Sequence, residues 1–237
     1  MARVGAIAAA WEIAKKDARI EMRTREIVST AGVFSIVIGF LASMAFQSDQ
    51  RTNASTAAAT IWITLFFAAV LSFGRIWQRE RDESALTGLL VSPIPRASIF
   101  LGKALATAAM IAIIEVPLVA LVMFLFQIDF TPKTGGPSES IHLAAFIGML
   151  AMGTLALALI GTLFGAMTVR TRARDLVLAI VLFPLLSPVL VCGVVGTRRA
   201  FEVQPFDVYE GFLGLMAVFV FVGLAAGIGL FGALVDE

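Results

Sequence analysis

The chain has 237 residues, of which 59% are hydrophobic and only 15% charged, and its mean hydropathy is +0.93. A soluble domain has about 45–50% apolar and about 25% charged residues. A disordered chain is less hydrophobic than a soluble domain, so both classes are excluded. The formal net charge of +1 gives no basic excess for binding nucleic acid. The single cysteine, Cys192, excludes an intrachain disulfide framework and a Cys-rich zinc site. These figures leave a polytopic membrane protein.

Six apolar segments are each long enough to cross a bilayer as a helix, which takes about 20 residues. They are Ile27–Phe46, Ala54–Gly74, Ala104–Ile128, Ile141–Val169, Leu176–Val195 and Gly211–Val235. Of the 18 basic and 17 acidic residues, only Glu115 lies inside them. The runs are continuous rather than alternating, which favours helices over barrel strands. We therefore expect an all-α membrane protein with six transmembrane helices in a single domain over residues 1–237.

The basic residues are distributed unequally between the two sides of these spans. Fourteen of the 18 lie in the N-terminal segment and in the second and fourth loops, and only Arg51, Lys133, Arg198 and Arg199 lie on the other side. Because Lys and Arg are enriched in cytoplasmic loops, this asymmetry predicts that both termini face the cytoplasm.

Residues 1–26 have the pattern of an amphipathic helix. At 100° per residue the apolar side chains fall on one face, and charged ones lie opposite them. The apolar face comprises Ile7, Trp11, Ala14, Ala18 and Met22, and the charged face Glu12, Lys16, Arg19 and Arg23. A tryptophan with Lys and Arg is typical of a helix in the headgroup plane, and we adopt this interpretation. The alternative is a solvated helix that simply leads into the first span.

The loop 75–103 is the most informative polar segment. Residues 75–83 are dense in charge of alternating sign, and Leu86, Leu89 and Leu90 follow at helical spacing. The segment Ser92-Pro93-Ile94-Pro95 ends that helix, and a new helix can begin at Pro95 and lead into the third span. Such an element could transmit force from a soluble partner to two membrane helices. A charged connector that only maintains the topology is the alternative.

The chain carries no motif of nucleotide hydrolysis or metal catalysis. It contains no GxxxxGK[ST] phosphate loop, no HExxH and no CxxCH, and its one histidine cannot build a multi-histidine metal site. We therefore expect a non-enzymatic chain with no catalytic residues, no metal site and no cofactor of its own.

Two single residues are candidates for a special role. Glu115 is an intramembrane carboxylate two residues before Pro117. Such a group lines a pathway or pairs across a subunit interface, or else it carries a proton or bonds the backbone groups that Pro117 frees. His142 stands at the outer end of the fourth span and is a candidate heme ligand, because imidazole binds heme iron. A histidine at an interface can also be merely polar, and both alternatives stay open.

Two patterns of small residues occur in the spans. They are Gly161-xxx-Gly165 in the fourth and Gly223-xxx-Gly227 in the sixth. Small residues at this spacing permit close helix contact but do not indicate which helices meet.

Several of these features together resemble a known family. Phe73-Gly74-Arg75, Glu80-Arg81-Asp82, Leu86, the run from Leu89 to Arg96 and Gly102-Lys103 resemble the cytoplasmic loop of ABC-2 type exporter permeases. Trp62 and the run from Ala14 to Glu26 resemble the B-subunit family of the heme exporter of cytochrome c maturation, the Ccm system.

This resemblance implies a permease in the bacterial inner membrane, with an N-terminal elbow helix (1–26) and a cytoplasmic coupling loop (75–103). It implies a homodimer bound to two copies of an ATPase A subunit, with heme-handling C and D subunits and a heme chaperone as further partners. ATP would be hydrolysed in the partner, to export heme or to release the loaded chaperone. The implied coupling helix places the ATPase contacts at Arg79, Glu80, Arg81, Asp82, Glu83 and Leu86.

Three other functions remain to be compared with this one. The first is an ABC-2 permease for another cargo, namely a lipid, a drug or a glycan. The second is a self-sufficient secondary transporter or channel, which needs more buried titratable groups than Glu115 and His142 provide. The third is a passive membrane scaffold.

Overall fold

The computed structural model describes residues 5–46, 50–82, 94–128, 139–168, 174–202 and 207–236. For the helical residues 50–52, 74–75, 77–82, 139–142, 168, 174–179, 207–208 and 235–236 it describes the backbone alone. The described residues form seven α-helices and no strand. In chain order they are α1 (Ala6–Thr24), α2 (Glu26–Phe46), α3 (Gln50–Asp82), α5 (Arg96–Leu125), α6 (Glu139–Thr168), α7 (Arg174–Phe201) and α8 (Asp207–Asp236).

Six of these helices, α2 to α8, are long and apolar enough to cross a membrane. Each coincides with one of the six predicted spans, so the all-α membrane class and the span count are confirmed. The described helices are longer than the spans that they contain. Charged and polar residues extend α3, α5 and α7 beyond the apolar stretch, because helical hydrogen bonding does not stop where hydrocarbon gives way to water.

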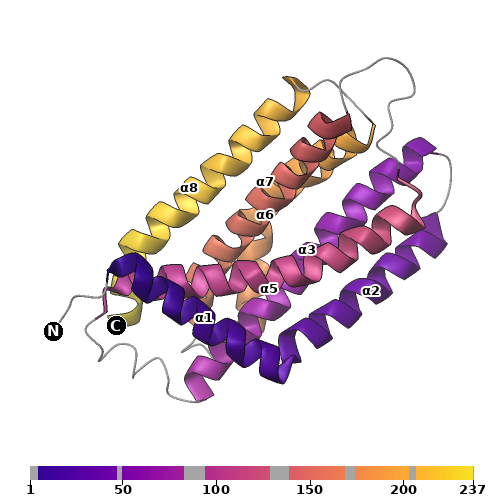
Figure 1. The fold of residues 1–237 in the computed structure, drawn as a ribbon. Coiled ribbons are helices and arrows are strands. Elements are labelled where there is room, and N and C mark those ends of the chain that lie inside the picture. Colours follow the sequence, from indigo (N-terminus) through magenta and orange to yellow (C-terminus); the bar gives the residue numbers. More distant parts are fainter. Residues whose placement is uncertain are drawn as a thin grey trace.

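The central helix of the bundle is α5, which contacts α1, α2, α3, α6 and α8. On one side α2 packs against α3 and α5, and on the other α8 packs against α6 and α7. Figure 1 shows α3, α6, α7 and α8 rising in roughly the same direction, α5 crossing them obliquely, and α1 lying across one end of the bundle. The start of α1 approaches the end of α8 at that same end, since Ile13 and Phe231 belong to one apolar cluster.

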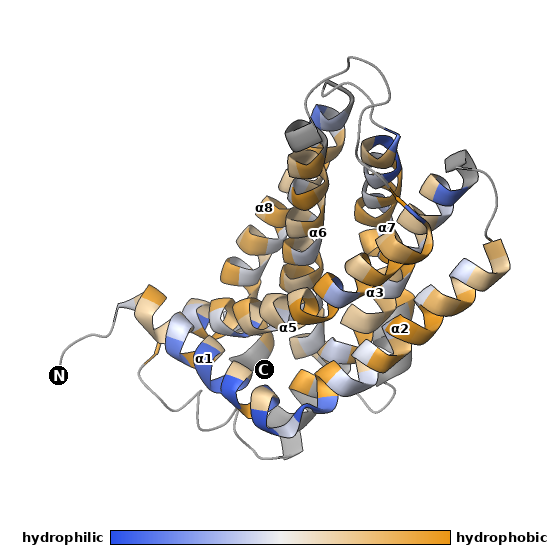
Figure 2. Ribbon diagram, turned by 45° about the vertical axis from the view of Figure 1, so that its right-hand side comes forward, coloured by the Kyte–Doolittle hydropathy of each residue, from blue (hydrophilic) through white to orange (hydrophobic). Residues whose placement is uncertain are grey.

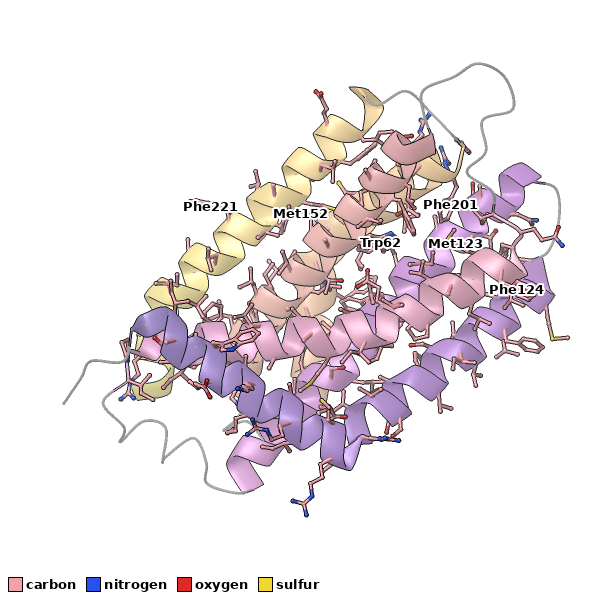
Figure 3. The ribbon with its side chains drawn as sticks, viewed as in Figure 1. Trp62, Met123, Phe124, Met152, Phe201 and Phe221 are labelled. Atoms are coloured by element: carbon pink, nitrogen blue, oxygen red, sulfur yellow. The ribbon has the colours of Figure 1, made fainter. Side chains whose placement is uncertain are left out.

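Apolar side chains face outward as well as inward, as expected of a protein surrounded by lipid. Figure 2 shows hydrophobic residues along the middle of the long helices and hydrophilic residues gathered on α1 and near helix ends. In Figure 3, Trp62 lies inside the bundle, whereas Phe124 and Phe221 point away from it. A soluble protein rarely exposes such a continuous apolar surface, so the surface itself supports a multi-pass membrane protein.

The third span is entered by a helix that begins at Pro95, as predicted, whereas Leu86, Leu89, Leu90 and the predicted helix end at Ser92-Pro93 lie outside the described residues. Pro95 occupies the N-cap position of α5, and Arg96 is its first helical residue. Proline suits the start of a helix because its fixed φ angle is pre-organised and it has no N–H that needs a partner. By contrast, α3 continues without interruption through Gly74 to Asp82, so the first charged part of the loop 75–103 belongs to the same helix as the second span.

The C-terminal end of the fifth span differs from the predicted bounds. The helix α7 contains both Pro184 and Pro188 and continues to Phe201, six residues beyond Val195, where the predicted span ends. Tyr209, two residues before the sixth predicted span, is fully buried at the start of α8 and donates a hydrogen bond from its hydroxyl to the carbonyl of Arg199 at 3.1 Å. This bond satisfies a carbonyl at the end of α7 and ties the two helices together.

Glycines at helix contacts accommodate aromatic rings. Trp62 of α3 lies between Gly153 of α6 and Gly193 of α7, and a Cβ added at either glycine would collide with the indole. The indole Nε1 donates a hydrogen bond to Thr197 Oγ1 at 2.9 Å. Because the ring fits against a glycine of α6 and a glycine of α7 and is bonded to Thr197, it fixes the relative positions of α3, α6 and α7.

Candidate functional site

The residues predicted to contact an ATPase lie only partly within the described chain. The backbone of Arg79, Glu80, Arg81 and Asp82 forms the last turn of α3. This turn ends nine residues beyond Phe73, which places it about 14 Å past the apolar part of the helix at 1.5 Å per residue. Glu83 and Leu86 lie outside the described residues. The structure therefore places the first four at the end of the bundle that α1 crosses, and the predicted coupling role remains a prediction.

At that end, four helices meet around one small apolar cluster. Ile76 of α3 packs with Ala14 of α1, Ile27 of α2, and Ala106 and Met110 of α5. All five side chains are buried. The end of α3 that leads into the predicted coupling loop is thus in contact with the α1, α2 and α5 helices.

A buried ion pair joins α1 to α5 beside this cluster. Lys103 Nζ lies 2.7 Å from Asp17 Oδ2, with side-chain exposures of 1% and 8%. Lys16, which is more exposed, lies 3.4 Å from the other oxygen of Asp17. The prediction that Lys103 is a loop cation is wrong, because this residue lies in the second turn of α5 and its charge is balanced inside the protein.

The backbones of α1 and α5 approach each other closely next to the ion pair. A Cβ placed on Gly102 would lie 2.7 Å from the carbonyl oxygen of Ala10 and 2.7 Å from Ile13 Cβ. Ile13 in turn packs with Ile99, Phe100 and other residues of a second apolar cluster. Only glycine at position 102 allows the two helices to be this close.

The joint between α1 and α2 is fixed by a side-chain cap. Glu21 Oε1 accepts hydrogen bonds from the backbone N–H groups of Ile27 at 2.7 Å and Val28 at 3.0 Å, in the first turn of α2. Arg25 between the helices adopts the left-handed conformation, with φ 54°. A carboxylate at a helix N-terminus satisfies free N–H groups and interacts favourably with the helix dipole.

The face of α1 that packs on the bundle is not the apolar face predicted from the sequence. The buried residues are Ala9, Ala10, Ile13, Ala14, Asp17 and Glu21. Of the predicted apolar face, Ile7, Trp11 and Met22 remain exposed, Trp11 by 61%. The small alanines bring α1 close to α5, and the two acids find partners within the chain. Ile7, Trp11 and Met22 are left facing outward, so the interfacial interpretation of α1 stays a prediction.

Glu115 lies inside the chain, in the contact between α5 and α6. Its residue exposure is 6%, and Oε2 accepts a hydrogen bond from Thr154 Oγ1 at 2.5 Å. Eight residues away on each helix, the hydroxyl of Thr162 donates a bond to the hydroxyl of Thr107 at 3.4 Å. Because the two contacts are eight residues apart on both α5 and α6, they belong to a single antiparallel pairing of these helices. Glu115 therefore bonds a neighbouring helix, rather than an outer surface or the backbone near Pro117.

His142 belongs to the first turn of α6, but its side chain lies outside the described part. Its candidacy as a heme ligand therefore remains a prediction. Within the described part of the chain, no three His, Cys, Asp or Glu side chains come together as they would around a metal ion.

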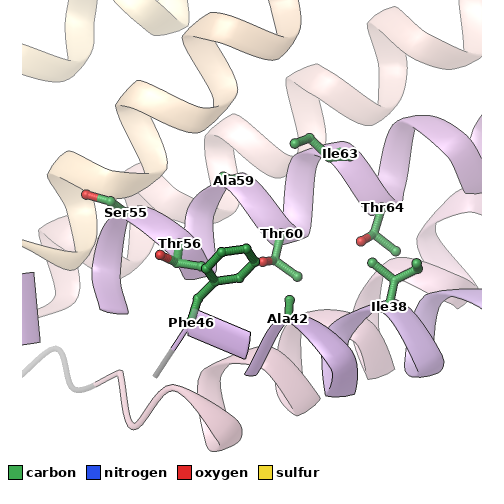
Figure 4. Close-up of a pocket in the computed structure, with 9 residues that line it drawn as sticks. All are labelled: Ile38, Ala42, Phe46, Ser55, Thr56, Ala59, Thr60, Ile63 and Thr64. Atoms are coloured by element: carbon green, nitrogen blue, oxygen red, sulfur yellow. The ribbon is translucent and has the colours of Figure 1, made fainter. Parts of the chain in front are cut away.

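A shallow groove of about 420 Å³ lies between α2 and α3 (Figure 4). Its walls are largely apolar, with hydroxyl groups along the α3 side. The lining comprises Ile38, Ala42, Phe46, Ser55, Thr56, Ala59, Thr60, Ile63 and Thr64. The groove lies within the two apolar spans, so its opening faces the region that hydrocarbon would occupy.

Comparison with known proteins decides the family. The family model described as CcmB protein matches residues 8–229, from the first turn of α1 to the last third of α8. The chain belongs to the CcmB protein family. The matched range includes the ion pair between α1 and α5, the end of α3 and Glu115.

Individual relatives of this CcmB family member share about a quarter of its residues. A protein named heme exporter protein B from Rhodobacter capsulatus is 26% identical over 190 residues, which cover 79% of this chain and 81% of the relative. The protein of the same name from Pseudomonas aeruginosa is 25% identical over 181 residues, or 75% of each chain. That from Haemophilus influenzae is 26% identical over 211 residues, or 87% of this chain and 89% of the relative.

Sequence reasoning missed the polar contacts that organise the site. Asp17 lies on the alanine face of α1, beside Ala10 and Ile13 in a helical projection, and this position is a signal that it is buried. Lys103 follows Gly102 at the start of an apolar stretch and gives a similar signal. Nothing in the sequence indicated that the two side chains would meet, because they are 86 residues apart.

Proposed function

We propose that this chain is the membrane-spanning permease subunit of an ABC transporter complex that handles heme for cytochrome c maturation. The observation that carries the proposal is the match to the CcmB family over residues 8–229. Relatives named heme exporter protein B, aligned over three quarters or more of both chains, support the heme assignment.

In this proposal the chain performs no catalysis and holds no cofactor of its own. It works as a homodimer in the bacterial inner membrane, with both termini in the cytoplasm. A separate ATPase subunit hydrolyses ATP, and heme-handling C and D subunits and a heme chaperone complete the complex. Heme is cargo of that complex, and ATP hydrolysis drives its export or the release of the loaded chaperone. His142 and Glu115 are the residues of this chain to examine for contact with the cargo.

The mechanical part of the proposal rests on the end of the bundle where α1, α3 and α5 meet. The last turn of α3 carries Arg79, Glu80, Arg81 and Asp82 beyond the apolar stretch, and α5 resumes at Arg96. A push on the intervening loop would act on both helices at once. The residues proposed to receive it are those four, together with Glu83 and Leu86.

Deletion of the gene tests the heme assignment. We expect the deletion strain to lose covalent cytochrome c, measured by heme staining of denatured membrane and periplasmic proteins, and expect a plasmid copy to restore it. Normal cytochrome c in the deletion strain would exclude the heme pathway and leave a permease for a lipid, drug or glycan.

Charge reversal tests the contact with the ATPase. The triple variant Glu80→Lys, Asp82→Lys, Glu83→Lys should lose co-purification with the ATPase subunit and the stimulation of its activity. A matched control is Glu12→Lys, which reverses an exposed charge on α1. Unchanged association and stimulation in the triple variant would assign these residues to topology alone.

A further inference from the structure

The ion pair between Asp17 and Lys103 requires an explanation beyond stability. Both side chains are withdrawn from water, and their charged atoms are 2.7 Å apart. Removing two charges from water costs free energy that their attraction often only balances, so an apolar pair of similar volume stabilises a protein equally well or better. We therefore ask which relative position of α1 and α5 the geometry of this buried pair fixes.

The surfaces that the pair joins are made mostly of small side chains. The apolar part of the α1 face consists of Ala9, Ala10, Ala14 and one larger residue, Ile13, and it rests on Gly102 and Ala106 of α5. Apart from Ile13, which packs with Ile99 and Phe100, few side chains interdigitate here, so apolar packing constrains the register of α1 on α5 only weakly. A hydrogen-bonded ion pair has one favourable geometry and therefore sets the register of the two helices.

The pair also links the predicted coupling loop 75–103 to the first membrane span. Lys103 is the last residue of that loop and lies in α5, seven residues after the first helical residue, Arg96. On the other side, Asp17 is one turn from Glu21, whose carboxylate caps the start of α2. Displacement of the start of α5 can thus pass through Lys103 and Asp17 into α1, and through Glu21 into α2.

We propose that Asp17 and Lys103 form a register lock that makes α1 and the start of α5 move as one body, so that a movement of the coupling loop reaches α2 as well as α5. The two are positioning residues, since each acts by bonding the other inside the protein. This inference rests on the proposed function, because it needs an ATPase that moves the loop.

The test uses the complex of the chain with its ATPase subunit, purified in lipid nanodiscs. The main variant is Asp17→Leu with Lys103→Met, which removes both charges and leaves no unpaired one. We expect it to fold and to co-purify with the ATPase, while the stimulation of ATP hydrolysis over the isolated ATPase falls about five-fold or more. The charge exchange Asp17→Lys with Lys103→Asp should recover most of the stimulation. Lys15→Met, which removes an exposed lysine of α1, serves as control and should leave stimulation unchanged.

The possible results separate this inference from the proposed function. A wild-type complex without association or stimulation refutes the proposed function, and the register lock with it. If the wild-type complex is coupled, three results overturn the lock alone. The first is a doubly apolar variant with wild-type stimulation of ATP hydrolysis. The second is a doubly apolar variant that fails to fold, which would make the pair purely structural. The third is a charge-exchange variant that folds but does not stimulate ATP hydrolysis.

Discussion

Replacing Gly102 by alanine is the sharpest test of how closely α1 is seated on α5. The added methyl group would lie 2.7 Å from the Ala10 carbonyl oxygen and 2.7 and 2.9 Å from Cβ and Cγ2 of Ile13. Carbon atoms pack at about 3.5 Å or more, so α1 has to withdraw by about 0.8 Å. A change of side-chain rotamer cannot relieve the contact, because the carbonyl and Cβ move only with the helix.

The cost of this substitution has two parts. Overpacking of a tight contact costs about 1–3 kcal/mol. A withdrawal of about 0.8 Å also stretches the bond between Lys103 and Asp17 from 2.7 Å to about 3.5 Å, beyond the usual 2.7–3.2 Å of such a bond. A hydrogen bond to a charged group is worth about 1.5–3 kcal/mol, and part of it is lost. We therefore expect Gly102→Ala to destabilise the protein by about 2–4 kcal/mol.

Thermal unfolding in detergent, followed by tryptophan fluorescence, measures this effect. For a chain of this size the midpoint should fall by about 5 °C or more. The matched control is Gly229→Ala, an exposed glycine inside α8 with no atom within 4 Å of an added Cβ. The control should melt at or above the wild-type temperature, because alanine is the better helix former. A Gly102→Ala protein that melts with the control would refute the close approach of α1 and α5.

Substitutions at three further positions test single polar contacts by the same unfolding measurement. Glu21→Ala removes the cap of α2 and should cost about 1 kcal/mol, whereas Glu21→Gln keeps an acceptor and should cost less; equal melting of the two would argue against the cap. Thr197→Val leaves the buried indole N–H of Trp62 without a partner and should cost about 1–3 kcal/mol, so a neutral result would contradict the bond. Glu115→Gln keeps an acceptor for Thr154 and should change stability by less than about 1 kcal/mol. It should also retain cytochrome c assembly, and its loss in a stably folded variant would show that the charge itself is needed.

The spans were predictable from the sequence because each depends only on local composition. A continuous apolar run has to cross the bilayer as a helix whatever its neighbours are, and Pro95 sets the start of α5 through its own backbone. The orientation prediction depends on charge in the same local way. It stays a prediction, and the burial of Lys103 changes its count only from fourteen basic residues to thirteen, against four on the other side.

The polar contacts of Asp17 and Trp62 were not predictable, because each depends on a partner far away in the chain. The position of Asp17 on the alanine face of α1 signals burial, but its partner Lys103 follows 86 residues later and nothing local identifies it. The hydrogen bond of the Trp62 indole was unpredictable for the same reason, since its acceptor Thr197 follows 135 residues later. The face of α1 that packs on α5 was not predictable for a related reason, because hydrophobicity alone does not reveal which face finds complementary small residues.

The glycine patterns predict that helices approach closely, but they do not predict which helices. Gly161 and Gly227 were predicted to permit close contact between helices, and both do lie in helix contacts. What fills the space at each is an aromatic ring, Phe73 at Gly161 and Phe100 at Gly227, rather than the backbone of another glycine-bearing helix. A glycine creates a notch, but the ring that enters it determines which two helices meet. Gly161 therefore joins α6 to α3, and Gly227 joins α8 to α5, because each notch needs a ring at the matching depth in the bundle.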